Sequence, residues 1–173
     1  EARDRILAMF QPLDSEYVDL LDGLGQVLDE DIVSNINIPP LSNSAMDGYA
    51  VQHADISMAN AESPVTLNVD GYIAAGQLPD HPVIKGRTIR IMTGAPIPPG
   101  ADTVIPFEDT NEYELKNLGL GPMDIDKIEI KIESPIGSNV RPSGQDIKIG
   151  EKVLSQGMVL RPGEIGVIAS LGR

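Results

Sequence analysis

Glycine and proline occur throughout the chain and limit what it can fold into, since 17 glycines and 14 prolines are spread over 173 residues. Proline interrupts helices and central strands, and glycine weakens both kinds of element. Short strands joined by turns therefore suit this sequence better than long helices. The chain has no tryptophan and only two phenylalanines, so its core must be built from isoleucine, valine, leucine and methionine. We expect a mainly β protein with short helices.

Alternating apolar residues between turn signals predict a series of short strands. In the middle of the chain these are expected at 48–52, 65–69, 88–92, 103–106 and 127–132. Before them we expect a short helix up to Gln11, ended by Pro12, then a brief strand at 17–19, helical turns through residue 28 and a strand at 31–38. After them we expect an exposed, aperiodic excursion within 114–126, strands at 146–153 and 158–160, and a helix from Pro162 that stops at Gly172.

The order of these elements predicts two parts. Residues 41–142 are expected to form a compact β body. Residues 1–40 and 143–173 are expected to form an elongated, linker-like module built from both ends of the chain, with the body inserted between them.

The charge balance argues against several classes of partner. Thirteen Lys and Arg against 26 Asp and Glu leave a net charge of -13. Nucleic acids and anionic lipid surfaces are both bound mainly through cationic side chains, so neither is expected as a partner. No apolar run approaches the length of a membrane helix, and the absence of cysteine fits a reducing compartment, so we expect a cytoplasmic protein without membrane contact.

The first segment that can carry chemistry is 43–51, which follows a double proline and leads into an expected strand. Asp47 lies at its tip, and Ser44 precedes it by three residues. The alternative is that Asp47 and Gly48 only form a turn, because both residue types tolerate turn geometry.

The second segment is 91–102, where an expected strand delivers Thr93 and Gly94 to a turn. The threonine hydroxyl and successive backbone N–H groups can converge there on an anion or a ligand oxygen. It is not a Walker loop, because the lysine and the following hydroxyl residue of that motif are missing. A rigid turn stiffened by prolines is the alternative.

The third segment is 139–147, in which Arg141 and Asp146 flank a Ser-Gly turn. A guanidinium can face an anion and a carboxylate can face a metal ion. The alternative is a surface ion pair between the two side chains, worth about 0–1 kcal/mol. Zinc is not expected, because His53 and His81 have no partner at metal-ligand spacing.

Together, these segments closely resemble the motifs of the MoeA family, the molybdopterin molybdenumtransferases. The long motifs are SAMDGYAV at 44–51, IRIMTGAPIPPGAD at 89–102 and NVRPSGQDIKIGE at 139–151. Shorter similarities run along the rest of the chain, with GLGQVL at 23–28, DIV at 31–33, IPP at 38–40, FEDT at 107–110 and EIGVIASLG at 164–172. The resemblance implies the family's N-terminal fold of bifurcated β-sheets.

The resemblance also implies an activity. Family members insert molybdate into adenylylated molybdopterin with release of AMP, depend on a divalent cation such as Mg²⁺, and work as homodimers. Carried over by motif, Asp47, Thr93 and Asp146 match catalytic positions, and Ser44, Gly94 and Arg141 match substrate-binding positions. Asp47 and Asp146 are also expected to hold the metal ion.

Relatives continue beyond the point that corresponds to Arg173, into a pterin-binding α/β domain and a small β domain, so we expect a fragment that is inactive alone. Two other functions stay open at this stage. One is a non-catalytic scaffold or interaction module of the gephyrin type. The other is an unrelated β-rich binder of sugars or nucleotides, which would make the three motif matches coincidental.

Overall fold

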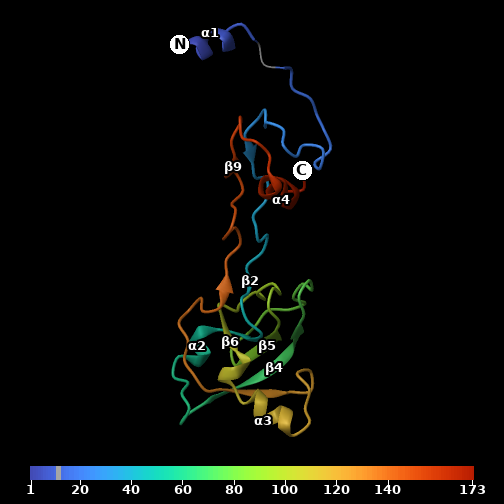
Figure 1. Ribbon diagram of the computed structural model, residues 1–173. Helices are drawn as coiled ribbons and strands as arrows, with labels where there is room; N and C mark the ends of the chain where they lie inside the picture. The colour runs from blue at the N-terminus through green and yellow to red at the C-terminus, as the bar shows by residue number, and fades with distance from the viewer. Residues whose placement is uncertain (11–12) are drawn as a thin grey trace. The chain divides into compact units, whose positions relative to one another are not determined.

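The computed structural model describes residues 1–10 and 13–173. It is mainly β with short helices, as expected, and it divides into two compact units. The first contains residues 1–36 and 149–173, and the second contains residues 37–148. Figure 1 shows the elements of both units.

The second unit is built on a five-stranded mixed sheet, ordered β6-β3-β5-β4-β7. All neighbours in it are antiparallel except β4 and β5, which are parallel. Its strands are β3 (Gly48–Val51), β4 (Val65–Ile73), β5 (Arg87–Ile91), β6 (Thr103–Pro106) and β7 (Lys127–Ile130). The helices of this unit are α2 (His53–Ile56), the 3₁₀ turn η1 (Phe107–Asp109) and α3 (Glu112–Asn117).

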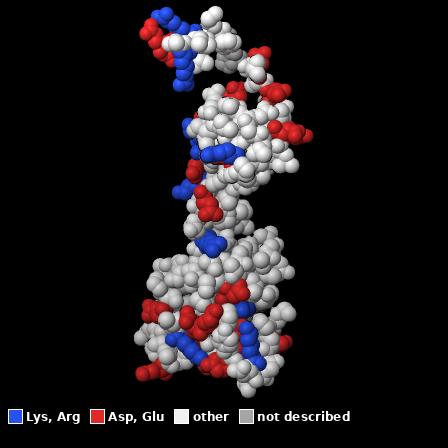
Figure 2. All heavy atoms as spheres, viewed as in Figure 1, with Lys and Arg blue, Asp and Glu red and all other residues white. Residues whose placement is uncertain are grey.

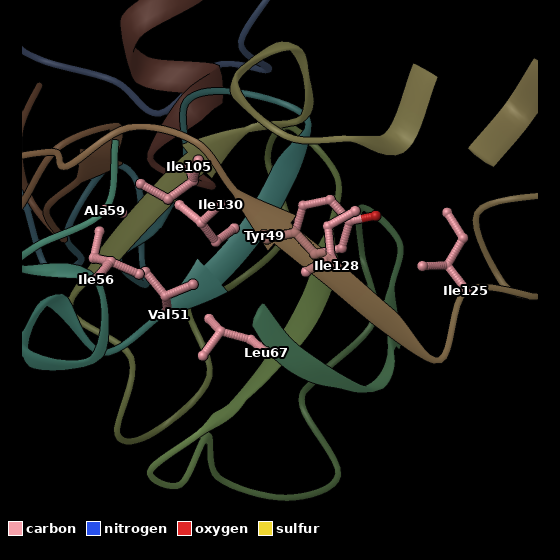
Figure 3. Close-up of a cluster of buried hydrophobic side chains, with 9 residues drawn as sticks. All are labelled: Tyr49, Val51, Ile56, Ala59, Leu67, Ile105, Ile125, Ile128 and Ile130. Carbon is pink, nitrogen blue, oxygen red and sulfur yellow. The ribbon is translucent and has the colours of Figure 1, made fainter. Parts of the chain in front are cut away.

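Both faces of this sheet are buried. Tyr49 and Val51 of β3 point into one cluster and Ala50 between them points into the other, because successive side chains of a strand alternate. Figure 3 shows the larger cluster, in which the Tyr49 hydroxyl points away from Val51 and Ile56. The smaller cluster contains Ala50, Ile73, Val83, Ile89, Ile91, Ala95 and Val104.

A two-stranded ribbon extends the second unit. β2 (Asn43–Ser44) pairs antiparallel with β8 (Val140–Arg141), and the pairing continues to a bridge between Ile38 and Ile147. Between these points the Gly144 N–H donates to the Pro39 carbonyl. The ribbon therefore brings the segment before Asp47 alongside the segment that contains Arg141 and Asp146.

The first unit is smaller. β1 (Ile32–Val33) pairs antiparallel with β9 (Lys152–Leu154), and a bridge joins Val27 to Val159. Helix α4 (Pro162–Ser170) begins with proline in its first turn, and α1 (Ala2–Leu7) lies near the N-terminus. The buried apolar side chains of this unit are Ile32, Leu154, Leu160, Ile165, Ile168 and Leu171.

Several sequence expectations need correction. No strand forms at 17–19, and residues 20–25 form turns, because the glycines there interrupt regular structure. The expected strand at 31–38 is reduced to β1 and an isolated bridge at Ile38, and the one at 146–153 to a bridge at Ile147 and the first two residues of β9. The expected strand at 158–160 is reduced to a single bridge at Val159. Part of the excursion at 114–126 is helix α3, and α2 was not anticipated. The expected end of the first helix, Gln11 and Pro12, lies outside the described residues, and α1 ends at Leu7.

Within residues 1–10 and 13–173, none of the helices is both long enough and apolar enough to cross a membrane. Figure 2 shows Lys and Arg side chains interspersed with Asp and Glu side chains on the visible face, and they do not gather into one basic patch.

Gly48 allows two strands of the second unit to approach closely, and replacing it should be costly. A Cβ built at Gly48 would lie 1.9 Å from the Ile105 carbonyl oxygen of β6. We expect Gly48→Ala to lower the free energy of unfolding by several kcal/mol. This exceeds the roughly 1–3 kcal/mol typical of an overpacked core, because the backbone of β6 would have to move away from β3. Urea unfolding followed by circular dichroism measures this effect.

Gly166→Ala is the matched control, because Gly166 is exposed within α4 and a Cβ there meets nothing within 4 Å. We expect it to raise stability by up to about 1 kcal/mol through helix propensity. Equal effects of the two substitutions would show that close approach at Gly48 does not constrain the sheet.

Candidate functional site

Asp47 and Thr93 are in contact at the edge of the sheet where β3 begins and β5 ends. Gly48 pairs with Ile91 across β3 and β5, so the residue before β3 and the turn after β5 lie at the same end of the pair. The Asp47 carboxylate oxygen Oδ1 accepts two hydrogen bonds of 2.7 Å, one from the Thr93 backbone N–H and one from its hydroxyl. Asp47 is half-buried and Thr93 is exposed, so the contact lies at the surface.

The environment keeps the Asp47 carboxyl ionised. Its pKa lies below the ordinary aspartate value, chiefly because the Thr93 hydroxyl and backbone N–H donate to it. Partial burial opposes this shift, and the nearby positive charges of Arg90 and Lys116 add to it. The half-buried Asp47 side chain is therefore negatively charged at neutral pH, and it binds the turn that contains Thr93.

Ser44 and Gly94 join the Asp47 loop to the Thr93 turn. The Gly94 N–H donates to the Ser44 carbonyl over 2.8 Å, and the Ser44 N–H donates to the Ala95 carbonyl over 2.9 Å. The buried Ser44 hydroxyl donates to the Met46 carbonyl over 2.5 Å. Gly94 has φ +82°, which glycine adopts without strain, and Thr93 and Gly94 form a turn as the sequence predicts.

Arg141 lies beside the same loop. It is exposed on β8, opposite Asn43, and Asn139 two residues earlier accepts a hydrogen bond from the Ala45 N–H. Asn139 has φ +57°, an unusual conformation for a residue other than glycine, and its side-chain amide donates to the Val104 carbonyl. The ribbon thus holds Arg141 next to the loop that carries Asp47.

Asp146 is not part of the Asp47–Thr93 contact. Its backbone N–H donates to the Ile38 carbonyl, at the end of the ribbon away from Asp47, and its side chain is exposed. Ser44 lies six positions after Ile38 in the sequence, which at about 3.3 Å per residue spans up to about 20 Å. Among the ion pairs of the described chain there is none between Arg141 and Asp146, so the surface-pair alternative is wrong.

The described residues contain no group of three or more His, Cys, Asp or Glu that could hold a metal ion. Mg²⁺ often uses only one or two protein carboxylates and completes its shell with water and phosphate oxygens. An ionised Asp47 carboxylate at the surface fits that use. Asp47 and Asp146 do not form a preassembled pair, so each would contribute as a single ligand.

A charged cluster beneath Asp47 was missed by the sequence analysis. The Arg90 side chain is 4% exposed and the Glu112 side chain 0% exposed. Arg90 Nε and Nη2 donate to the two Glu112 oxygens over 2.9 and 3.2 Å, the Tyr49 hydroxyl donates to Glu112 Oε2 over 2.7 Å, and Lys116 Nζ lies 2.8 Å from Oε1. No sequence signal distinguishes this arginine, because in an alternating strand a charged residue normally faces solvent.

The hydrogen bonds within this cluster keep Glu112 ionised although it is buried. Burial by itself would raise the pKa of Glu112, but hydrogen bonds from Lys116, Arg90 and Tyr49 outweigh it and keep the pKa below the ordinary value. Burial, together with the adjacent Glu112, raises the pKa of the Tyr49 hydroxyl. Glu112 is therefore an anion and Tyr49 a neutral donor.

Thr93→Val tests the Asp47 contact. The substitution removes the hydroxyl donor and keeps the side chain's shape and the backbone N–H. We expect the Asp47 pKa to rise toward the ordinary value of about 3.9, measured by NMR titration of the side-chain carboxyl. Because the pKa of Asp47 is lower in the folded chain than in the unfolded chain, the contact stabilises the fold at pH values above the ordinary pKa. This contribution is lost as the pH falls through the pKa of the folded chain.

The stability difference between Thr93→Val and the unsubstituted chain should therefore be about 1 kcal/mol at neutral pH, since the bond is charged but partly exposed. It should shrink below about pH 4. Thr66→Val, at an exposed threonine on β4, is the control and should leave the Asp47 titration unchanged. An unshifted Asp47 in Thr93→Val would mean that the hydroxyl does not contribute.

Comparison with known proteins agrees with the motifs. Molybdopterin molybdenumtransferase 2 of Mycobacterium tuberculosis is 36% identical over 155 residues, which are 90% of this chain and 36% of that protein. Molybdopterin molybdenumtransferase of Staphylococcus epidermidis is 36% identical over 172 residues, 99% of this chain and 38% of that protein. This chain therefore spans less than two fifths of the length of these relatives.

A similar structure has also been solved. The crystal structure of the molybdopterin biosynthesis moeA protein from Pyrococcus horikoshii OT3 matches with a TM-score of 0.81 and 35% identity, over 92% of this chain and 39% of that chain. The family described as MoeA N-terminal region (domain I and II) matches residues 1–172. The chain, with its Asp47–Thr93 contact between two motifs of that region, belongs to this family.

Proposed function

We propose that this chain is the N-terminal part of an enzyme of molybdenum cofactor biosynthesis that inserts molybdate into adenylylated molybdopterin and releases AMP. The observation that carries the proposal is the contact between Asp47 and Thr93. It joins two of the motifs that resemble the family, and it presents an ionised carboxylate beside a hydroxyl at the surface. The names of the relatives, which are molybdopterin molybdenumtransferases, support molybdopterin and molybdate as the substrates.

Asp47 and Thr93 form the catalytic pair of this proposal. Asp47 would orient a water molecule or a divalent cation, and the exposed Thr93 hydroxyl would contact the substrate. Gly94 would shape the turn that presents Thr93, and Ser44 would act through the loop, since its hydroxyl is engaged with Met46. Arg141, an exposed guanidinium on β8, would face an anionic group of the substrate.

Asp146 belongs to the proposal in a separate position. It is exposed at the far end of the ribbon, so it would contact a different part of the substrate or its metal ion from Asp47. We propose Mg²⁺ as the cation, because isolated carboxylates with water and phosphate oxygens suit its coordination. Asp47 and Asp146 would each hold such an ion as a single protein ligand at its own position, and a bound ion would supply positive charge beside the phosphates.

The rest of the binding surface would come from outside this chain. Its net charge of -13 is unfavourable for molybdate and a phosphate-containing pterin, so cationic groups are needed from elsewhere. We propose that a homodimer and further domains supply them. The cytoplasmic location stays a prediction. The division of this chain into residues 41–142 and residues 1–40 with 143–173 also stays a prediction. No observation favours the scaffold alternative.

Substitution of the two aspartates tests the proposed roles. We expect Asp47→Asn in the complete gene product to reduce molybdate insertion by about 100-fold or more, because amides neither bind Mg²⁺ well nor act as bases. Asp146→Asn should reduce it as well. The measurement is nitrate reductase activity in a bacterial strain that lacks molybdate insertion, combined with single-turnover AMP release by the purified protein.

Asp70→Asn is the control, because Asp70 is a surface aspartate on β4 paired with Arg87, away from the proposed site. It should restore activity fully. If Asp47→Asn and Asp146→Asn both matched this control, the assigned roles would be wrong. If the unsubstituted gene product did not restore activity, the scaffold alternative would replace the enzyme.

A further inference from the structure

Arg90 contacts both strand ends from which the site loops leave the sheet. Its Nη1 lies 3.3 Å from the Gly48 carbonyl, 3.0 Å from the Ile91 carbonyl and 3.7 Å from Met92 Sδ. Gly48 follows Asp47 directly, and Met92 directly precedes Thr93. One guanidinium therefore lies against the backbone on both sides of the Asp47–Thr93 contact.

The other side of the guanidinium is fixed by Glu112. Two parallel hydrogen bonds join Arg90 to this carboxylate, which also accepts from Tyr49 and pairs with Lys116. The Arg90 guanidinium carbon lies 5.4 Å from the centre of the Tyr49 ring and 5.5 Å from that of Phe107. Its orientation is thus determined by charge, by hydrogen bonds and by two aromatic rings.

The same cluster reaches Asp47 by a second route. The Phe107 N–H donates to the Asp47 carbonyl over 3.2 Å, and the Phe107 ring flanks both Arg90 and Lys116. Asp47 is therefore held through its side chain by Thr93, through its own carbonyl by Phe107, and through the next carbonyl by Arg90. Only the first of these contacts belongs to the site described above.

Stability alone does not explain a charge cluster in this place. Arg90 lies on the sheet face that carries the larger apolar cluster, and burying an ion pair costs desolvation that the pairing seldom exceeds. Apolar side chains of similar volume usually serve equally well for stability. A planar fork that reaches a carboxylate and two carbonyls at once, however, has no apolar substitute.

We propose that the buried Arg90–Glu112 pair is the positioning element of the site, and that it holds Asp47 and Thr93 in register for the reaction. Neither residue is proposed to touch substrate. The inference rests on the proposed function for its consequence in catalysis, but the positioning itself is a property of the free chain. It can therefore be measured without substrate.

Hydrogen exchange of the Thr93 amide is the readout, because this N–H donates to Asp47. In Arg90→Lys the charge and one bond to Glu112 are kept, but the fork is lost. We expect the Thr93 amide to exchange at least about 10-fold faster, while the Ile89 amide in the centre of β5 exchanges as before. Arg87→Lys, at an exposed arginine of the same strand paired with Asp70, is the matched control and should change neither rate.

A triple variant separates positioning from stability. Tyr49→Phe, Arg90→Met and Glu112→Met together remove the two buried charges and leave none of the three side chains with an unpaired polar atom. Lys116 loses its partner but is 36% exposed, so its ammonium group can be hydrated. We expect a melting temperature close to that of the unsubstituted chain and a Thr93 amide that still exchanges at least about 10-fold faster. An apolar core that restored Thr93 protection along with stability would overturn the proposal.

Arg90→Lys keeps the proposal falsifiable if the triple variant does not fold. Unchanged exchange at Thr93, or an equal increase at Thr93 and Ile89, would show that the pair has no positioning role. In the complete gene product, Arg90→Lys should lower kcat about 10-fold or more with little change in KM, as misplacement of reacting groups does. The proposed function itself is judged by Asp47→Asn, so the two inferences fail on different results.

Discussion

The pairing of β3 with β5 is the constraint on which the candidate site depends. Gly48 opposes Ile91, so the chain enters β3 from Asp47 and leaves β5 toward Thr93 at one end of an antiparallel pair. A shift of one residue would turn every side chain of the strand to the other face. Because both faces of the sheet are packed with apolar side chains, such a shift is costly, and the core fixes the contact at the surface.

Next to that contact, the sheet buries a charged side chain on a face that is otherwise packed with apolar side chains. Arg90 faces the same cluster as Tyr49 and is compensated by Glu112, which α3 brings from further along the chain. Removing one partner would leave a buried unpaired charge, which typically costs about 3–5 kcal/mol. The segment after β6 is therefore tied to the strand ends that carry the site, and α3 matters to the site although it contributes no group to it.

The site is also divided. Asp47, Thr93, Ser44, Gly94 and Arg141 gather around the loop before β3, whereas Asp146 lies at the other end of the ribbon. Two carboxylates so placed cannot bind the same Mg²⁺ ion, because its ligands lie at about 2.0–2.1 Å.

The sequence by itself determined the class of fold, the strands around the site and the motifs that identify the family. Strands 103–106 and 48–52 were anticipated almost residue for residue, because alternation and turn residues are local signals. It did not give the shortening of the expected strand at 31–38 to β1, the absence of a strand at 17–19 or helix α3. Only the tertiary structure decided that Arg90 is buried, that Glu112 neutralises it and that Asp146 lies apart from Asp47. These depend on which segments pair across 22 to 100 or more residues of chain, and such contacts leave no periodicity in a single sequence.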